Sequence, residues 1–288
     1  MSSLESIFLI ASLAGVVLTL IFAIIASVGS RRNVILAVEK KSGSKSTAAE
    51  PQSVLFLTAR VLTVLSLVFV TLTIVFRAIQ TRHGPFSNMY EFALAFVWGI
   101  VVMGVIFEWR YKTTALRNMG LIVALLLLIF ATVKHAKPEP LVPALQQSTL
   151  LSIHVASAVV AYGIFTIGFC AAILFLIQNR RNLTWLPDKE VLDNISFRSV
   201  TVGFPFLTLT IVLGAIWADI AWGKFWSWDP KETASLVTWL IYAAYMHARL
   251  MRGWRGTKTA ILLIVGFGAI LLTFFGNYIF SGLHAYNN

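Results

Sequence analysis

The sequence is poor in charge, in cysteine and in the motifs of soluble enzymes. Only 12% of its 288 residues are charged, and its single cysteine is Cys170. One cysteine cannot form an internal disulfide, and a lone thiol within a long apolar run is typical of a small buried side chain. The chain also lacks a phosphate-binding glycine-rich loop, an HExxH zinc pattern and a nucleophile elbow, so nothing supports an ATPase or a hydrolase.

Long apolar runs are what the sequence has instead. Hydrophobic residues make up 58% of the chain, and a run of about 20 apolar residues crosses the hydrocarbon core of a bilayer as a helix. We therefore predict an all-α, polytopic integral membrane bundle of about eight transmembrane helices, forming a single membrane domain over residues 1–288. The spans are expected near residues 7–28, 54–76, 91–107, 118–134, 151–177, 199–218, 233–249 and 259–280.

The basic residues are distributed unevenly between the two ends of this bundle. Sixteen of the 23 lie in the segments that follow odd-numbered spans, six lie on the opposite face, and Arg60 lies within the second span. Because cytoplasmic loops carry the excess of Lys and Arg, both termini are expected outside and residues 30–52 form a mobile cytoplasmic linker. The net charge of +11 is then mainly a topology signal, and nucleic-acid binding is not expected.

Tryptophans are concentrated in one outer loop. Four of the nine lie within twelve positions, at Trp217, Trp222, Trp226 and Trp228. An indole offers a large flat apolar face with one N–H donor, which suits a membrane interface and equally suits stacking on a planar ligand. Two interpretations are open at this point: an interfacial aromatic belt, or a platform for a flat ligand.

The end of this loop also has the pattern of a helix start. Asp229 suits an N-cap, Pro230 the first helical position and Glu232 the third. Asn88 and Glu91 repeat this arrangement at the start of the third span. The pattern predicts that these carboxylates cap helices.

Topology sorts the five histidines. His154 and His284 are expected on the same outer face as the Trp-rich loop, where two imidazoles can supply both axial ligands of a haem iron. The alternative for each is an ordinary interfacial histidine. His247 follows Glu232 by fifteen positions, roughly 22 Å along a helix, which places an ionisable group in the inner half of the membrane. A ligand role and a structural hydrogen bond are both open for it. His83 and His135 rank lower because no aromatic cluster adjoins them in the sequence.

Residues 217–232, WADIAWGKFWSWDPKE, resemble the WWD signature of the haem-handling membrane proteins of cytochrome c maturation. They are similar to the form found in the CcsA/ResC-type subunits of System II cytochrome c synthases. Supporting segments are residues 84–91, 153–155, 245–249 and 282–286. Mild departures from the family pattern are Phe225, Ala234 and Ala285, and none of them removes a histidine.

The resemblance implies a function in cytochrome c biogenesis. Haem b, as substrate and ligand, is presented outside and joined through thioether bonds to the Cys-x-x-Cys-His motif of apocytochrome c, with a CcsB/ResB-type membrane subunit as partner. The implied location is the bacterial plasma membrane, or the thylakoid membrane, with the WWD loop outside or in the lumen.

The resemblance also implies roles for individual residues. His154 and His284 would ligate the iron and His247 a transmembrane haem, while the four tryptophans hold the porphyrin. Asp229 and Glu232 have either a capping role or one in protonating a vinyl group. The alternatives are a System I-type haem delivery protein, a haem-bearing electron-transfer subunit and a solute transporter.

Overall fold

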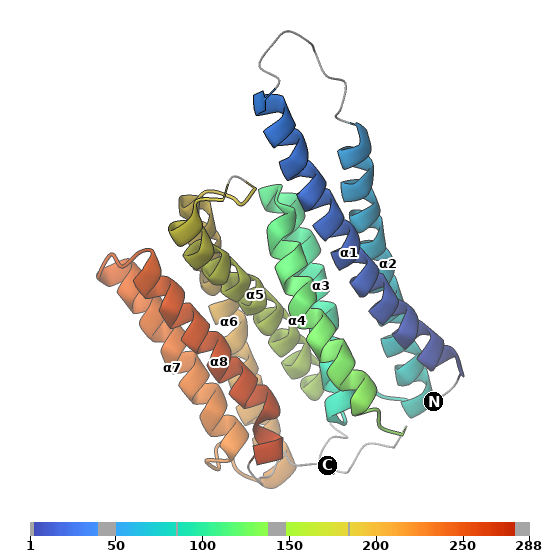
Figure 1. The fold of residues 1–288 in the computed structure, drawn as a ribbon. Coiled ribbons are helices and arrows are strands. Elements are labelled where there is room, and N and C mark those ends of the chain that lie inside the picture. The colour runs from blue at the N-terminus through green and yellow to red at the C-terminus, as the bar shows by residue number, and fades with distance from the viewer. Residues whose placement is uncertain (1–2, 40–49, 85, 138–147, 184, 280–288) are drawn as a thin grey trace. The chain divides into compact units, whose positions relative to one another are not determined.

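The prediction of an all-α chain is confirmed by a computed structural model, which describes residues 3–39, 50–84, 86–137, 148–183 and 185–279 (Figure 1). Side chains of residues 3, 28–39, 50–53, 148 and 277–279 are outside that description. Eight helices make up the described chain. They are α1 (Ser3–Glu39), α2 (Glu50–Thr81), α3 (Met89–Tyr111), α4 (Thr114–Val133), α5 (Ser148–Arg181), α6 (Lys189–Trp222), α7 (Pro230–Met251) and α8 (Thr257–Ile279).

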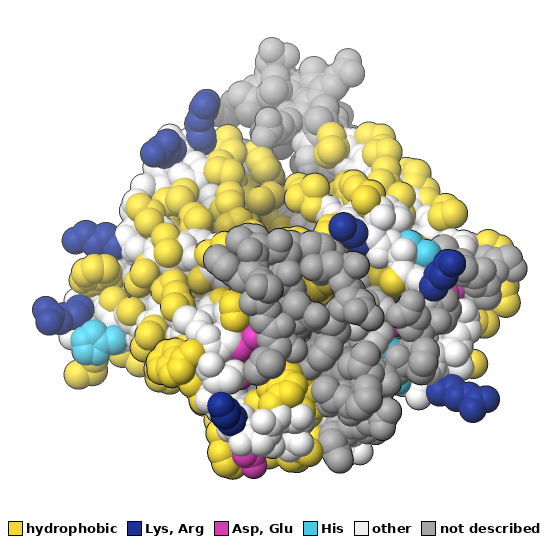
Figure 2. All heavy atoms as spheres, turned by 90° about the horizontal axis from the view of Figure 1, so that it is seen from below, with side chains coloured by type: hydrophobic (Ala, Val, Ile, Leu, Met, Phe, Trp, Pro, Cys, Tyr) yellow, Lys and Arg dark blue, Asp and Glu magenta, His cyan; other side chains and the backbone are white. Residues whose placement is uncertain are grey.

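Seven of these helices are long and apolar enough to cross a membrane. The exception is α7, which carries Lys231, Glu232 and Arg249 near its ends. Large apolar side chains such as Leu126, 63% exposed, lie on the surface, and apolar side chains predominate on the described part of the face in Figure 2. A helix satisfies its own backbone hydrogen bonds, which hydrocarbon demands of any spanning segment. The chain is therefore a polytopic membrane protein.

The chain divides into two compact units, Met1–Thr73 and Ile74–Asn288. In the first unit, α1 and the first part of α2 pack through small residues, because a Cβ at Gly15 would lie 2.3 Å from Ser66 Oγ. Buried hydroxyls in this unit bond to carbonyls of their own helix, as Ser66 does to Leu62 at 2.7 Å. Such small-residue contacts are typical of helix pairs in membranes. The expected linker at 30–52 overlaps the end of α1 and the start of α2, its residues 40–49 lie outside the described residues, and its mobility stays a prediction.

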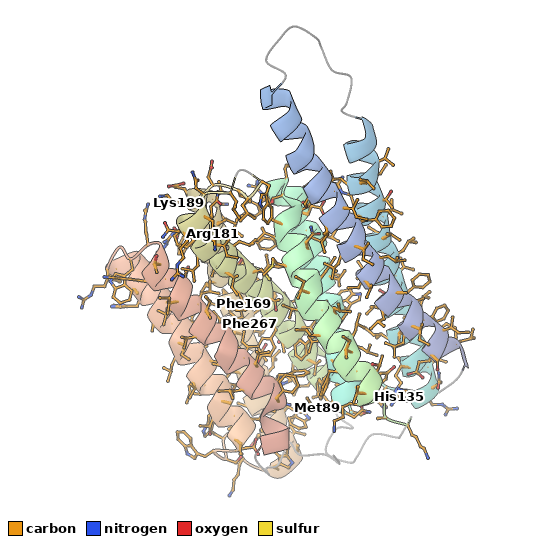
Figure 3. All side chains as sticks on the ribbon, in the orientation of Figure 1. Met89, His135, Phe169, Arg181, Lys189 and Phe267 are labelled. Atoms are coloured by element: carbon orange, nitrogen blue, oxygen red, sulfur yellow. The ribbon has the colours of Figure 1, made fainter. Side chains whose placement is uncertain are left out.

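Helix α5 is the centre of the second unit. Its Phe169 stacks on Phe267 of α8 with ring centroids 4.1 Å apart (Figure 3), and its Phe165 stacks on Tyr242 of α7 at 3.9 Å. On the side facing α3, a Cβ at Gly163 would lie 2.8 Å from the Gly99 carbonyl oxygen. The two backbones thus approach so closely that only glycine fits between them.

The two ends of the second unit differ in their polar groups. Arg181 and Lys189 lie at one end, and Met89 and His135 lie at the other (Figure 3). Near the first end, Arg117 pairs with Glu108 at 2.8 Å and Arg249 pairs with Asp193. The Trp-rich loop between α6 and α7 shares the second end with the start of α3 (Figure 1). The sequence expected these loops to share an end, and the side of the membrane they face stays a prediction from charge.

The close contact between α3 and α5 generates the first prediction. Gly163→Ala should lower the melting temperature of the detergent-purified protein, because the added methyl group overlaps the Gly99 carbonyl and overpacking costs about 1–3 kcal/mol. Gly268→Ala in α8 is the matched control, because nothing lies within 4 Å of its would-be Cβ. Equal melting temperatures for the two variants would contradict the close contact.

Candidate functional site

The loop between α6 and α7 is closed by a capping box. Helix α6 ends at Trp222, followed by Gly223 with φ of 71°, and α7 begins at Pro230. The Asp229 carboxylate accepts the Lys231 backbone N–H at 3.0 Å, while Glu232 accepts the N–H of Asp229 at 3.2 Å. The predicted capping role of both acids is confirmed.

Glu232 also fixes the middle of this loop. Its carboxylate accepts the backbone N–H of Ser227 at 2.8 Å and the Ser227 hydroxyl at 3.2 Å. Between these residues Trp228 has φ of 59°, a left-handed conformation that costs a bulky residue free energy. The bonds to Glu232 on either side of Trp228 hold the loop in this conformation.

The loop before α3 is also held by a glutamate at the third position of the helix, and this glutamate forms a buried ion pair as well. Asn88 caps the helix by accepting the Glu91 backbone N–H at 3.1 Å. The fully buried Glu91 accepts the backbone N–H and hydroxyl of Ser87 and the Nε–H of Arg77 at 2.8 Å. Arg77 also donates to the carbonyl oxygens of Ala136 and Lys137. The end of α2, the start of α3 and the segment after α4 are thereby tied together.

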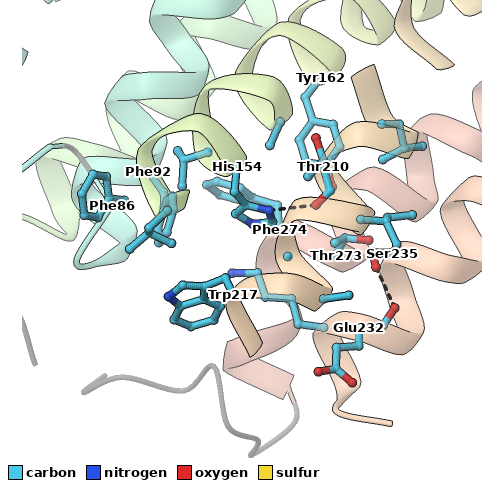
Figure 4. A pocket seen from close by; sticks show the side chains of 18 of the residues that line it. Phe86, Phe92, His154, Tyr162, Thr210, Trp217, Glu232, Ser235, Thr273 and Phe274 are labelled. Atoms are coloured by element: carbon cyan, nitrogen blue, oxygen red, sulfur yellow. Dashed lines mark hydrogen bonds between the residues drawn. The ribbon is translucent and has the colours of Figure 1, made fainter. Parts of the chain in front are cut away.

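Beside these loops lies a cavity of about 130 Å³, counted as the space open to the centre of a water molecule (Figure 4). Ligand pockets are typically apolar and aromatic with a few converging polar groups, and this cavity has that character. Its aromatic lining comes from Phe86, Phe92, Phe96, Tyr162, Trp217, Phe225, Trp226 and Phe274. Its polar lining includes His154, Thr210, Lys231, Glu232, Ser235 and Thr273.

His154 of α5 is held in a defined orientation on the cavity wall. Its Nδ1 lies 2.8 Å from the Thr210 carbonyl oxygen, drawn as a dashed line in Figure 4. A carbonyl only accepts, so Nδ1 carries the proton and the lone pair is on Nε2, the arrangement common to metal-binding histidines. A Cβ at Gly214 would lie 2.8 Å from His154 Cε1, so glycine makes room for the ring. The Thr210 carbonyl and Gly214 thus fix the orientation of this imidazole.

The four tryptophans divide into two pairs. Trp217 and Trp226 line the cavity, and Trp217 is only 2% exposed. Trp222 stands edge-on to Trp217 with centroids 4.8 Å apart, and Trp228 stands edge-on to Trp226 at 5.8 Å. Trp222 and Trp228 do not line the cavity, and Trp228 is 69% exposed. One tryptophan of each pair therefore contacts the cavity while the other lies behind it.

The remaining histidines lie elsewhere. His247 is exposed and does not line the cavity, and His284 lies outside the described residues. His83 and His135 each have one aromatic neighbour among the described residues, which is less than the aromatic cluster around His154. The His83 ring lies 5.9 Å from that of Phe86, and His135 stands edge-on to Tyr90 at 4.7 Å.

Lys231 and Gly214 are cavity residues that sequence reasoning missed. Helix capping accounted for the residues on either side of Lys231, so the lysine attracted no separate hypothesis. Gly214 carried a weak signal, because an isolated glycine inside a helix usually has a packing reason. Phe86 and Met89 lie in the segment 84–91 that the sequence did single out, although for its turn and cap.

The ion pair of Glu91 generates the second prediction. Glu91→Gln should lower the melting temperature of the purified protein markedly, because removing one partner of a buried pair costs about 3–5 kcal/mol. Glu190→Gln, at an exposed position in the first turn of α6, is the control and should change it little. A Glu91→Gln protein as stable as this control would mean that the Arg77 contact contributes no stability.

The sequence is similar to known proteins over most of its length. Residues 86–284 match the cytochrome c assembly protein family. The chain is 36% identical over 252 residues to the cytochrome c biogenesis protein CcsA of Guillardia theta, covering 78% of this chain and 83% of that protein. It is 33% identical to the CcsA of Porphyra purpurea, covering 79% and 86%. It is 35% identical to that of Prochlorococcus marinus strain MIT 9215, covering 80% and 85%.

Proposed function

The chain belongs to the cytochrome c assembly protein family, and from this premise we propose that it binds haem in the cavity beside the Trp-rich loop. Presented there at the outer face, the haem is attached to apocytochrome c together with a CcsB/ResB-type membrane subunit. The observation that carries the proposal is the His154 imidazole, oriented by the Thr210 carbonyl at 2.8 Å on the wall of an aromatic cavity.

The residues present suit a porphyrin. Trp217 and Trp226 offer flat apolar faces to the cavity, and Phe92 and Phe96 add aromatic surface from α3. His154 supplies an imidazole nitrogen, the commonest protein ligand of haem iron. A flat apolar ring and a metal at its centre are the two features that such a lining recognises.

The second axial ligand is assigned from the family resemblance. His284 follows α8, whose Thr273 and Phe274 line the cavity. His247 has a different place in the proposal, because it is exposed on α7 beside the exposed Leu240 and Leu250. An imidazole exposed on α7 can share a haem with a histidine of the partner subunit, so we assign His247 to a second, intermolecular site.

The chemistry itself comes from the two substrates. Ferrous haem b supplies two vinyl groups, and the apocytochrome supplies the thiols that add across them. The chain binds the ring, fixes the iron and excludes water, which makes its contribution mainly positional. Asp229 and Glu232 are already acceptors of backbone N–H groups in the capping box, and this favours their structural role over protonation of a vinyl group.

Replacing the proposed ligand is the direct test. In the complex purified with its partner, His154→Gly should remove the six-coordinate, bis-histidine absorption spectrum and most cytochrome c maturation. Gly214→Ala should weaken the same spectrum by displacing the ring, whereas Gly268→Ala, an exposed position with nothing in the described part of the chain within 4 Å of its would-be Cβ, should not. A His154→Gly complex with the unchanged spectrum and full maturation would refute the proposal.

The tryptophan pairs allow a matched comparison. Trp226→Leu should reduce the haem retained by the purified complex several-fold, because stacking on an aromatic face is worth about 0.5–1.5 kcal/mol beyond area burial. Trp228→Leu should reduce it less, since that side chain lies outside the cavity. Haem content and protein yield are measured together. Equal haem occupancy in wild type and both variants would return the loop to an interfacial belt.

A further inference from the structure

The proposed haem cavity contains one basic side chain that neither iron ligation nor porphyrin stacking uses. Among the described residues that line it, Lys231 is the only lysine or arginine. Its Nζ lies 5.0 Å from the centroid of the Phe92 ring, so the side chain extends from α7 towards α3. Within the described chain its ammonium group forms no ion pair.

Helix stability does not explain a lysine at this position. Lys231 lies in the first turn of α7, where the helix dipole favours acidic side chains and disfavours cations. Two acids adjoin it in sequence, but both are engaged elsewhere. Asp229 accepts the Lys231 backbone N–H, and Glu232 accepts donors from Ser227 and Asp229.

The electrostatics of the cavity favour an additional anion. Burial lowers the pKa of Lys231 to about 8, and the charge of Asp229 only partly opposes that shift. The ammonium form therefore carries a desolvation cost that the surrounding protein does not fully offset. A ligand carboxylate beside Nζ would offset it and gain a charge-assisted hydrogen bond.

We propose that Lys231 binds a propionate carboxylate of the porphyrin and thereby fixes the rotation of the ring within its own plane. This rests on the proposed function and deepens it. The vinyl and propionate groups of haem b lie on opposite edges of the ring, so a carboxylate held at Lys231 turns the vinyl edge away from α7. Lys231 is then a positioning residue that decides which edge the thiols of the apocytochrome meet.

Modified haems separate this carboxylate contact from iron ligation. The full-length complex with its partner, stripped of haem, is titrated with haem and with haem dimethyl ester, which keeps the iron and vinyl groups but lacks the carboxylate charge. Wild type should bind haem about tenfold or more tightly than the ester, as a charge-assisted bond predicts. Lys231→Met should lose that preference and Lys231→Arg should retain it. Lys224→Met, an exposed lysine of the same loop outside the cavity lining, is the matched control and should bind as wild type does.

The pH dependence of the preference for haem over its ester is a second test, because a purely structural role of Lys231 would not change that preference. The other titratable side chains of the cavity are His154 and Tyr162 from α5 and Glu232 from α7, with Asp229 beside Lys231; α3, α6 and α8 contribute no charged group to the lining. Because the ammonium is lost above a pKa of about 8, the preference of wild type for haem over the ester should fall between pH 7 and 10. A bound carboxylate raises that pKa and moves the loss to the upper part of this window. Lys231→Arg should keep the preference throughout, and taking the ratio of the two ligands cancels pH effects on the iron.

The outcomes distinguish the two proposals. If haem and its ester bind wild type equally well with a spectrum that depends on His154, the haem site stands and the Lys231 assignment is wrong. If neither ligand binds with a His154-dependent spectrum, the proposed function itself fails. A further experiment compares the yield of attached cytochrome with the haem content of the complex. Lys231→Met should lower the yield of correctly attached cytochrome more than it lowers haem content. A proportional loss of both would show that Lys231 does not orient the ring.

Discussion

Two carboxylates at helix starts, the buried Glu91 and the half-buried Glu232, hold the loops that form the candidate site. Glu91 and Glu232 each occupy the third position of a helix and each accepts the backbone N–H and the hydroxyl of a serine in the preceding loop. A carboxylate that is shielded from water, fully for Glu91 and partly for Glu232, is costly unless such donors surround it, so each acid constrains its loop. Arg77 extends the constraint from Glu91 to the segment after α4. The cavity between α3, α5, α6, α7 and α8 depends on these fixed loops.

Within that frame, the cavity combines three kinds of recognition on separate elements. Helix α5 contributes an oriented imidazole, α6 and the following loop contribute the faces of Trp217 and Trp226, and α7 contributes a cation at Lys231. Haem b has a matching set of features: an iron, a flat apolar ring and ionised carboxylates. In the proposed haem complex each feature is met by a different helix, so binding requires the α5–α8 bundle to be assembled first.

His247 is not part of the cavity that these helices form. It is exposed and lies outside the cavity lining, and its depth in the membrane stays a prediction from residue spacing. If α7 crosses the membrane as the sequence predicts, a polar ring exposed on it is costly in lipid alone. The cost is removed if another subunit covers it, and this is the physical basis for assigning it to a shared site.

The sequence by itself determined the helical spans, the ends at which the loops lie and the two capped helix starts. These features depend on apolar run length, charge asymmetry and side chains only a few residues apart. Tertiary structure decided which aromatic residues face the cavity, the pairing of His154 with Thr210 and the room that Gly214 leaves for the ring. It also decided the place of Lys231 opposite Phe92. Those contacts join residues tens to more than a hundred positions apart, and they follow from how the helices rotate and pack, which no local pattern of residues specifies.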